Sequence, residues 1–349
     1  MAVAPNDSNR FAVAPPFPWF GGKRRVADVV WKRFGDVAVY TEPFFGSGAV
    51  LLNRPHDPRI ENVNDKDCFV ANFWRATQQD PEAVAEWSDW PVNEADLHAR
   101  HLWLITEGKS IVERLRTDPD FYDAKIAGWW VWGICQWIGS GWCDTKAFTK
   151  DGGCEQKRPN LGDGVRGVHR TSQKRPHLGD AGLGVHRTSQ KRPHLGDAGR
   201  GVHQHYAYFQ SLSARLRRVR VCCGDWSRVC GHTPTDKCGT AGVFLDPPYP
   251  TEADRDMALY AEECGSVAHD VAKWAIENGD RKSMRIAFCG YEGSHQFPPS
   301  WECYAWKARG GYASQSGGDN ENARRERIWF SPHCLKPEAT KSLFKELEN

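Results

Sequence analysis

The chain has 349 residues, of which 40% are hydrophobic and 26% are charged, and its formal net charge is +2. This composition is typical of a soluble globular protein with one large domain or two ordinary ones. No apolar run is long enough to cross a bilayer, and the N-terminus lacks the layout of a secretion signal. We therefore expect a cytoplasmic protein that is not bound to membranes.

The N-terminal part of the chain predicts a loose arm followed by an α/β pattern. Residues 1–16 are rich in Ala, Pro and Asn, which is typical of an arm without regular structure. Residues 37–40 predict a short buried strand, and a glycine turn at 46–48 leads into an apolar helix start at 49–52. Residues 60–63 predict a second strand, which an Asn-Asp pair closes.

The middle of the chain predicts helices and then a repeat. From about residue 76 to 145 the pattern is helical, and tryptophans at 129, 130, 132, 137 and 142 have a spacing that suits a helix with a buried aromatic face. An eight-residue segment that begins at Gln156 recurs with one substitution at Gln173 and Gln190, a period of 17 residues. The unit is basic, and its Gly and Pro content predicts turns on the surface rather than a helix.

The α/β pattern returns after the repeat. Segments 219–223, 241–245, 285–289 and 327–330 each predict a short strand. The sequence therefore predicts an α/β domain that is interrupted by an insertion from about residue 76 to 205.

The twelve cysteines are scattered along the chain rather than concentrated in a short framework. Cys230, His232 and Cys238 fall loosely together, but no pair of Cys-x-x-Cys spacings is present. We expect reduced thiols, most of them packed in the interior, and no metal site.

Acidic residues follow four of the predicted strands, and these are Glu42, Asp65, Asp225 and Asp246. Ligands of open α/β sheets bind at the carboxyl ends of strands, so the four acids are expected to surround one pocket. Asp65 lies 17 positions beyond Gly48, about the distance at which nucleotide-binding folds place a ribose-binding carboxylate. Any one of the first three acids alone would favour a capping role, and only their shared position favours a pocket.

The most specific motif is Asp246-Pro247-Pro248-Tyr249, directly after an apolar strand. The two prolines end the strand and stiffen the turn. The amino group of a purine is a poor nucleophile because its lone pair is delocalised into the ring. A carboxylate and a backbone carbonyl that accept its two N–H hydrogens would favour the nucleophilic form, and the aromatic ring would stack on the base. An ordinary strand-ending turn is the alternative, but such a turn needs no aromatic residue after the prolines.

Motifs at both ends of the chain resemble those of the Dam-type N6-adenine DNA methyltransferases of bacteria and their phages. Segment 17–23 (Phe-Pro-Trp-Phe-Gly-Gly-Lys) looks like the N-terminal motif, and segment 42–48 (Glu-Pro-Phe-Phe-Gly-Ser-Gly) is similar to the S-adenosylmethionine loop. Segments 64–75 and 225–226 look like the parts that contact ribose and adenine of the cofactor, segment 246–249 matches the catalytic motif, and segment 327–331 resembles the last strand.

The resemblance implies a Rossmann-like S-adenosylmethionine-dependent methyltransferase domain with an inserted, mainly helical and loop-rich target-recognition domain. The catalytic domain would comprise residues 17–75 and 206–335, and the insertion residues 76–205 with the repeats at 156–203. Residues 336–349 would form a C-terminal tail. The implied partner is double-stranded DNA, from which the target base is flipped out, and the reaction needs no metal.

Site residues follow from the same resemblance. The expected catalytic residues are Asp246, Pro247, Pro248 and Tyr249. The expected cofactor-binding residues are Trp19, Phe20, Gly22, Lys23, Glu42, Pro43, Phe44, Gly46, Ser47, Gly48, Asp65, Asp225, Trp226 and Asp246. The repeats supply basic residues that are candidates for DNA phosphates, namely Arg158, Arg170, Lys174, Arg175, Arg187, Lys191 and Arg192. Duplication of a tolerated surface segment without any function explains the repeats equally well.

Two other functions stay open at this point. Methylation of another planar amine, such as cytosine N4, guanine N2 or an RNA base, would use a related catalytic loop. Asp rather than Ser at the start of the catalytic motif, and a cofactor loop that precedes it, favour adenine. A DNA-binding protein with a relict cofactor site is a different class, and the intact Lys23, Asp65 and Asp246 argue against it.

Overall fold

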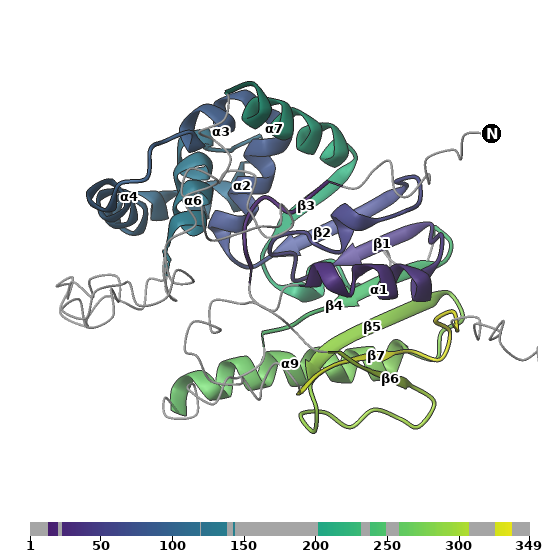
Figure 1. Ribbon diagram of the computed structural model, residues 1–349. Helices are drawn as coiled ribbons and strands as arrows, with labels where there is room; N and C mark the ends of the chain where they lie inside the picture. Colours follow the sequence, from purple (N-terminus) through teal and green to yellow (C-terminus); the bar gives the residue numbers. More distant parts are fainter. Residues whose placement is uncertain are drawn as a thin grey trace, which may run out of the picture.

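The computed structural model describes residues 13–19, 23–118, 120–137, 142–143, 202–231, 238–248, 258–306 and 325–336. Seven strands in this part of the chain form one sheet in the order β3-β2-β1-β4-β5-β7-β6 (Figure 1). They are β1 (Val39–Glu42), β2 (Ile60–Asp65), β3 (Val219–Cys223), β4 (Ala241–Leu245), β5 (Met284–Tyr291), β6 (Glu302–Ala305) and β7 (Glu326–Phe330).

The direction of the strands determines which residues meet at one edge. Strands β1 to β5 are mutually parallel, so their carboxyl ends lie together. Strand β7 is antiparallel to β5 and pairs Glu326 with Tyr291. The first residue of β7 therefore lies at the same edge as the last residue of β5.

Helices cover the sheet and extend beyond its β3 end. They are α1 (Ala27–Phe34), α2 (Cys68–Gln79), α3 (Pro81–Ser88), α4 (Glu94–Thr106), α5 (Ile111–Thr117), α6 (Ala124–Gln136), α7 (Val202–Leu216) and α9 (Ala258–Asn278), with short 3-10 helices η1 (Lys23–Arg25), η2 (Leu51–Asn53), η3 (Gly108–Ser110) and η9 (Trp226–Arg228). Figure 1 shows α3, α4, α6 and α7 grouped beside β3 and β2, whereas α9 lies at the β5 half of the sheet. None of these helices is long and apolar enough to span a membrane.

One hydrophobic core joins the sheet to the helical group. Phe17 lies at its centre, with its ring centroid 4.9 Å from that of Trp130 in α6 and 5.4 Å from that of Phe73 in α2. Phe209 of α7 packs against the same cluster and is fully buried. The described helices of the expected insertion thus share a core with the sheet, and the division into a catalytic and a recognition domain stays a prediction.

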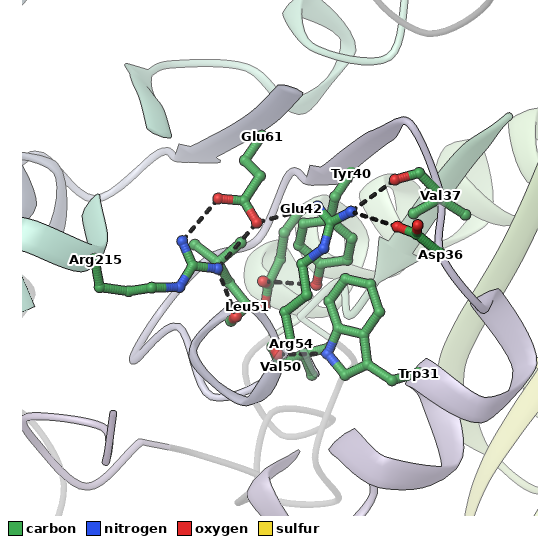
Figure 2. Close-up of polar contacts among 10 residues, drawn as sticks. All are labelled: Trp31, Asp36, Val37, Tyr40, Glu42, Val50, Leu51, Arg54, Glu61 and Arg215. Carbon is green, nitrogen blue, oxygen red and sulfur yellow. Dashed lines mark hydrogen bonds and ion pairs between the residues drawn. The ribbon is translucent and has the colours of Figure 1, made fainter. Parts of the chain in front are cut away.

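A buried network of charges fastens α7 to β2 and to the chain that follows β1. Glu61 accepts hydrogen bonds from Arg215 of α7 at 2.8 and 2.9 Å and from Arg54 at 3.1 Å (Figure 2). Arg54 also donates to the carbonyl of Val37, and Arg215 donates to the carbonyl of Leu51. These side chains are almost inaccessible to solvent, and charge-assisted hydrogen bonds to two guanidinium groups offset the cost of burying the carboxylate.

The structure confirms most of the predicted elements and corrects one. The strands predicted at 219–223 and 241–245 have the observed bounds of β3 and β4, and strand β1 ends two residues later than predicted. The prediction of a helix that starts at 49–52 is wrong, because the chain forms only the short 3-10 helix η2 there. Arg54 is extended (φ −59°, ψ 121°), the conformation that a following proline imposes, and its side chain is held in the Glu61 network.

The tryptophan-rich helix is confirmed as α6, which buries Trp130 and Trp132 at 2% exposure. Trp137 and Trp142 lie beyond the end of α6, yet they pack on each other with ring centroids 5.2 Å apart. Strand β6 was not predicted from the sequence. All four of its side chains are exposed, so it lacks the apolar pattern by which a strand is recognised.

Candidate active site at the carboxyl edge of the sheet

Three of the four predicted acids meet at the carboxyl edge of the sheet. Glu42 and Asp65 are the last residues of β1 and β2, and Asp246 directly follows β4. Burial raises the pKa of Glu42 well above its ordinary value; a hydrogen bond from Tyr40 lowers it, and the carboxylates of Asp246 and Asp65 raise it. The three carboxylates are therefore close enough to influence one another.

The fourth acid, Asp225, has a different local role. Its carboxylate caps η9 by accepting hydrogen bonds from the backbone N–H and the hydroxyl of Ser227, and these bonds lower its pKa. Asp225 is exposed. The capping role that the sequence left open is thus confirmed for Asp225, whereas its role toward a cofactor stays a prediction. The ring of the adjacent Trp226 is partly buried against the core.

The glycine turn after β1 is held tightly against β2. Gly46 and Gly48 have φ angles of 47° and 66°, in the left-handed region that favours glycine. The backbone N–H of Gly46 donates to Asp65 Oδ2 at 2.9 Å, and its carbonyl accepts a hydrogen bond from Trp74 at 2.9 Å. A Cβ atom on Gly46 would lie 2.2 Å from Nε1 of Trp19, so this turn has room for glycine only.

Asn64 connects the turn to a third strand. Its side-chain amide donates to the carbonyls of Pro43 and Gly224 at 3.1 and 3.0 Å, and thus holds the loops that follow β1 and β3. The backbone of the same segment contributes bonds from Phe45 N–H to the Asn64 carbonyl and from Gly224 N–H to the Asp65 carbonyl. Contacts with Asn64 thus anchor Pro43 and Phe45 to β2, in the segment that also contains Phe44 and Ser47.

Asp65 carries a half-buried carboxylate that accepts hydrogen bonds from backbone N–H groups. Its two oxygens accept hydrogen bonds from Gly46 and Asp67 at 2.9 Å each. Burial is the main reason why its pKa rises to about 7, and the charge of Asp67 adds to the effect. Such a group gains from a ligand that brings hydroxyl donors or positive charge, because either stabilises the ionised form.

Lys23, in η1, lies between two carboxylates at the β4–β5–β7 part of the edge. Its Nζ atom is 3.0 Å from Oδ1 of Asp246 and 3.7 Å from Oε2 of Glu326, the first residue of β7. Lys23 is only 6% exposed. Burial raises the pKa of Asp246, and the ammonium of Lys23 opposes that rise. Asp246 is thus an ionisable acceptor in a largely apolar setting with one fixed cation.

The turn after Asp246 begins as the sequence predicts. β4 ends at Leu245, and the two prolines that follow have no N–H with which to extend the sheet. Pro247 is buried and Pro248 is exposed. The backbone directly after Asp246 is therefore packed in the protein, and the chain reaches the surface one residue later. This arrangement can present a carboxylate oxygen and the carbonyl of Pro247 to a planar amine.

Several predicted site residues lie outside the described residues. They are Phe20, Gly22 and Tyr249, and all of the candidate DNA-binding residues, Arg158, Arg170, Lys174, Arg175, Arg187, Lys191 and Arg192. Their roles stay predictions. Conversely, Glu326 was not predicted as a site residue, and its only signal in the sequence is its place directly before the predicted strand at 327–330.

The described part of the chain contains no cluster of potential metal ligands. No group of three or more His, Cys, Asp or Glu side chains there is arranged to hold a metal ion. Ten cysteines of this part are free thiols. The edge instead offers carboxylates, one ammonium group and the half-buried rings of Phe44 and Trp226, a donor set suited to an organic ligand with hydroxyl groups, positive charge and an aromatic ring.

Comparison with known proteins gives one match. No curated protein matches the chain. The model of the D12 class N6 adenine-specific DNA methyltransferase family matches residues 19–96, which include Lys23, the glycine turn and Asp65. The matched segment runs from the residues before η1 into α4. Over residues 19–96 this chain is therefore similar to the D12 class N6 adenine-specific DNA methyltransferases.

Proposed function

We propose that this protein transfers a methyl group from S-adenosylmethionine to the N6 amino group of adenine in double-stranded DNA. The observation that carries the proposal is the meeting of Lys23, Glu42, Asp65 and Asp246 at one edge of a parallel sheet, the place where open α/β sheets bind ligands. The family match over residues 19–96 supports the same reaction.

The residues at the edge fit the cofactor by their chemistry. The carboxylates of Glu42 and Asp65 would hold its hydroxyl and ammonium groups, since burial raises the pKa of both and each gains from donors and positive charge. The half-buried rings of Phe44 and Trp226 would flank its purine. When bound, S-adenosylmethionine supplies an electrophilic methyl group attached to a sulfonium sulfur.

Asp246 would prepare the nucleophile. Its carboxylate and the carbonyl of Pro247 accept the two N–H hydrogens of adenine N6, which localises the nitrogen lone pair toward the methyl group. Lys23 contacts Oδ1 of Asp246 at 3.0 Å, which directs the carboxylate and favours its ionised form. Catalysis then consists mostly of positioning two reactants in line.

The adenine must leave the duplex to reach this edge. Flipping a base out of the stack costs a few kcal/mol. Stacking on an aromatic ring returns about 1–3 kcal/mol per base, and Tyr249 directly after the two prolines is our candidate for that ring. The basic repeats, proposed to contact DNA phosphates, would make binding depend on salt, and deletion of one 17-residue unit should then reduce the salt dependence of DNA binding.

The experiment that tests the function uses purified protein, tritiated S-adenosylmethionine and duplex DNA. Wild-type protein should transfer methyl groups to adenine, and Asp246→Ala and Tyr249→Ala should each lower the rate by at least about a hundredfold. Asp270→Asn, an exposed acid on α9, is the matched control and should keep the wild-type rate. A near wild-type rate with Asp246→Ala would remove the proposed mechanism.

A further inference from the structure

A lysine shared by two carboxylates is a second feature of the site. Lys23 Nζ lies 3.0 Å from Asp246 Oδ1 and 3.7 Å from Glu326 Oε2. The side chains of Lys23 and Glu326 are 6% and 8% exposed, and that of Asp246 is 17% exposed. The site thus contains one cation and two anions in a place that little water reaches.

The cluster contains more carboxylates than ammonium groups, and other titratable side chains lie near it. Cys289 and Tyr291 of β5 face the cluster, and burial and the charges of Asp246 and Glu326 raise the pKa of each of them. Glu42 contributes another carboxylate nearby. Arg325, beside Glu326 in the chain, lowers the pKa of Tyr291. Two ionised carboxylates on one ammonium would leave a net negative charge in the interior, which is unfavourable.

The surrounding structure fixes both Lys23 and Glu326. The carbonyl of Lys23 accepts a hydrogen bond from Val26 at 3.1 Å, and its Nζ atom lies 5.8 Å from the ring centroid of Trp306. The backbone of Glu326 pairs with Tyr291 in the sheet, and its carbonyl accepts a hydrogen bond from Trp306 at 3.4 Å. The backbone of each residue is thus anchored beside the carboxyl edge of the sheet, within reach of the other's side chain.

We propose that Glu326 is a positioning residue for the methyl transfer: it holds the ammonium of Lys23 against one oxygen of Asp246 and shares its charge. The inference rests on the function proposed above. Because Glu326 takes a share of the charge of Lys23, Asp246 keeps the basicity with which it accepts a hydrogen bond from adenine N6. Glu326 acts through Lys23 and touches neither substrate nor cofactor.

Replacement of the charge of Glu326 tests this coupling. In Glu326→Gln the second carboxylate cannot ionise, so the change in rate near pH 7, at which ionised Glu326 takes a share of the charge of Lys23, should be lost from the pH–rate profile. Glu326→Asp keeps the charge and should keep this change in rate. Glu292→Gln is the matched control, because Glu292 forms an exposed ion pair with Arg327, the residue next to Glu326.

A second readout does not depend on methyl transfer. Burial, together with the charge of Asp246, raises the pKa of Glu326 to about 7, although Lys23 lowers it. Infrared titration of the protein without cofactor should therefore show a carboxyl group that loses its proton near neutral pH. This signal should be smaller in Glu326→Gln and unchanged in Glu292→Gln.

The two readouts separate failure of this inference from failure of the proposed function. A pH–rate profile and an infrared titration that are the same in wild type and Glu326→Gln would overturn the role of Glu326. Absence of methyl transfer by the wild-type protein would remove the proposed function, and the infrared titration would then decide whether Glu326 is coupled to the Lys23–Asp246 pair. If Glu326→Gln fails to fold, Glu326→Asp takes its place in the comparison. The side chain of this variant is shorter, and a pH–rate profile, an infrared signal and a rate that all stay the same as in the wild type would contradict a positioning role.

Discussion

The backbone N–H of Gly46 donates a hydrogen bond to Oδ2 of Asp65 at 2.9 Å, and this contact joins the turn after β1 to the end of β2. The bond places a half-buried acceptor beside a turn whose peptide groups face the same edge of the sheet. A cofactor that contacts Asp65 would thus contact the glycine turn as well. The strength of cofactor binding should therefore depend on the geometry of this turn.

Substitution of Gly46 by alanine should weaken cofactor binding. The φ angle of 47° strains any L residue, and the added Cβ would lie 2.2 Å from Nε1 of Trp19. We expect a loss of about 2–4 kcal/mol in the free energy of unfolding, from backbone strain and overpacking together. Calorimetry should show at least about a tenfold weaker affinity for S-adenosylmethionine, since 1.4 kcal/mol corresponds to a factor of ten.

Gly293→Ala is the control for this substitution. Gly293 also has a positive φ, 79°, but an added Cβ there would meet nothing within 4 Å. It should lower stability by only about 1–2 kcal/mol, through backbone strain, and leave cofactor affinity unchanged. Equal effects of the two substitutions would mean that contact with Trp19 does not shape the turn.

The stability of the protein without cofactor should fall as pH rises from about 4 to 7. Asp65 has a pKa of about 7 in the folded protein and 3.8 as the ordinary value, because burial disfavours its charge. The folded state therefore binds more protons than the unfolded state in this window, and the free energy of unfolding decreases with pH, by at most about 4 kcal/mol from this group. Glu326 acts in the same direction.

Thermal unfolding between pH 4 and 8 measures this dependence. Asp65→Asn cannot ionise and should show a shallower decrease than the wild-type protein. S-adenosylmethionine should also reduce the decrease in the wild type, because its donors stabilise the ionised carboxylate. A decrease of the same size in wild type and Asp65→Asn would show that Asp65 does not titrate in this range.

Removal of the carboxylate of Glu61 should be strongly destabilising. Glu61 is fully buried and bonds to the guanidinium groups of Arg54 and Arg215. Loss of one member of a buried ion pair leaves the remaining charges without compensation and costs about 3–5 kcal/mol. Urea unfolding of Glu61→Ala should show this loss. Arg59→Ala, which removes an exposed ion pair with Asp36, should cost less than about 1 kcal/mol.

The sequence predicted the strands that carry the site because local composition decides them. The apolar segment 241–245 followed by Asp246 and two prolines can only end a strand at that point, and the structure has the end of β4 there. Likewise, two glycines after β1 predicted the turn that Gly46 and Gly48 form with positive φ angles.

The sequence could not predict the partners of Lys23. The ion pair between Lys23 and Asp246 joins residues far apart in the chain, and only the folded sheet brings them together. Glu326 reaches the site because β7 runs antiparallel to β5, and a short apolar strand has the same pattern in either direction. Asp225 shows the opposite case, in which an acid after a strand is used locally as a helix cap.

The most direct test of the proposed function is identification of the modified nucleoside in DNA from cells that express the protein. Digestion of that DNA and mass spectrometry should find N6-methyladenine with the wild-type protein and not with Asp246→Ala, while Asp270→Asn behaves as the wild type does. N4-methylcytosine in place of N6-methyladenine, or N6-methyladenine at the wild-type level with Asp246→Ala, would contradict the account.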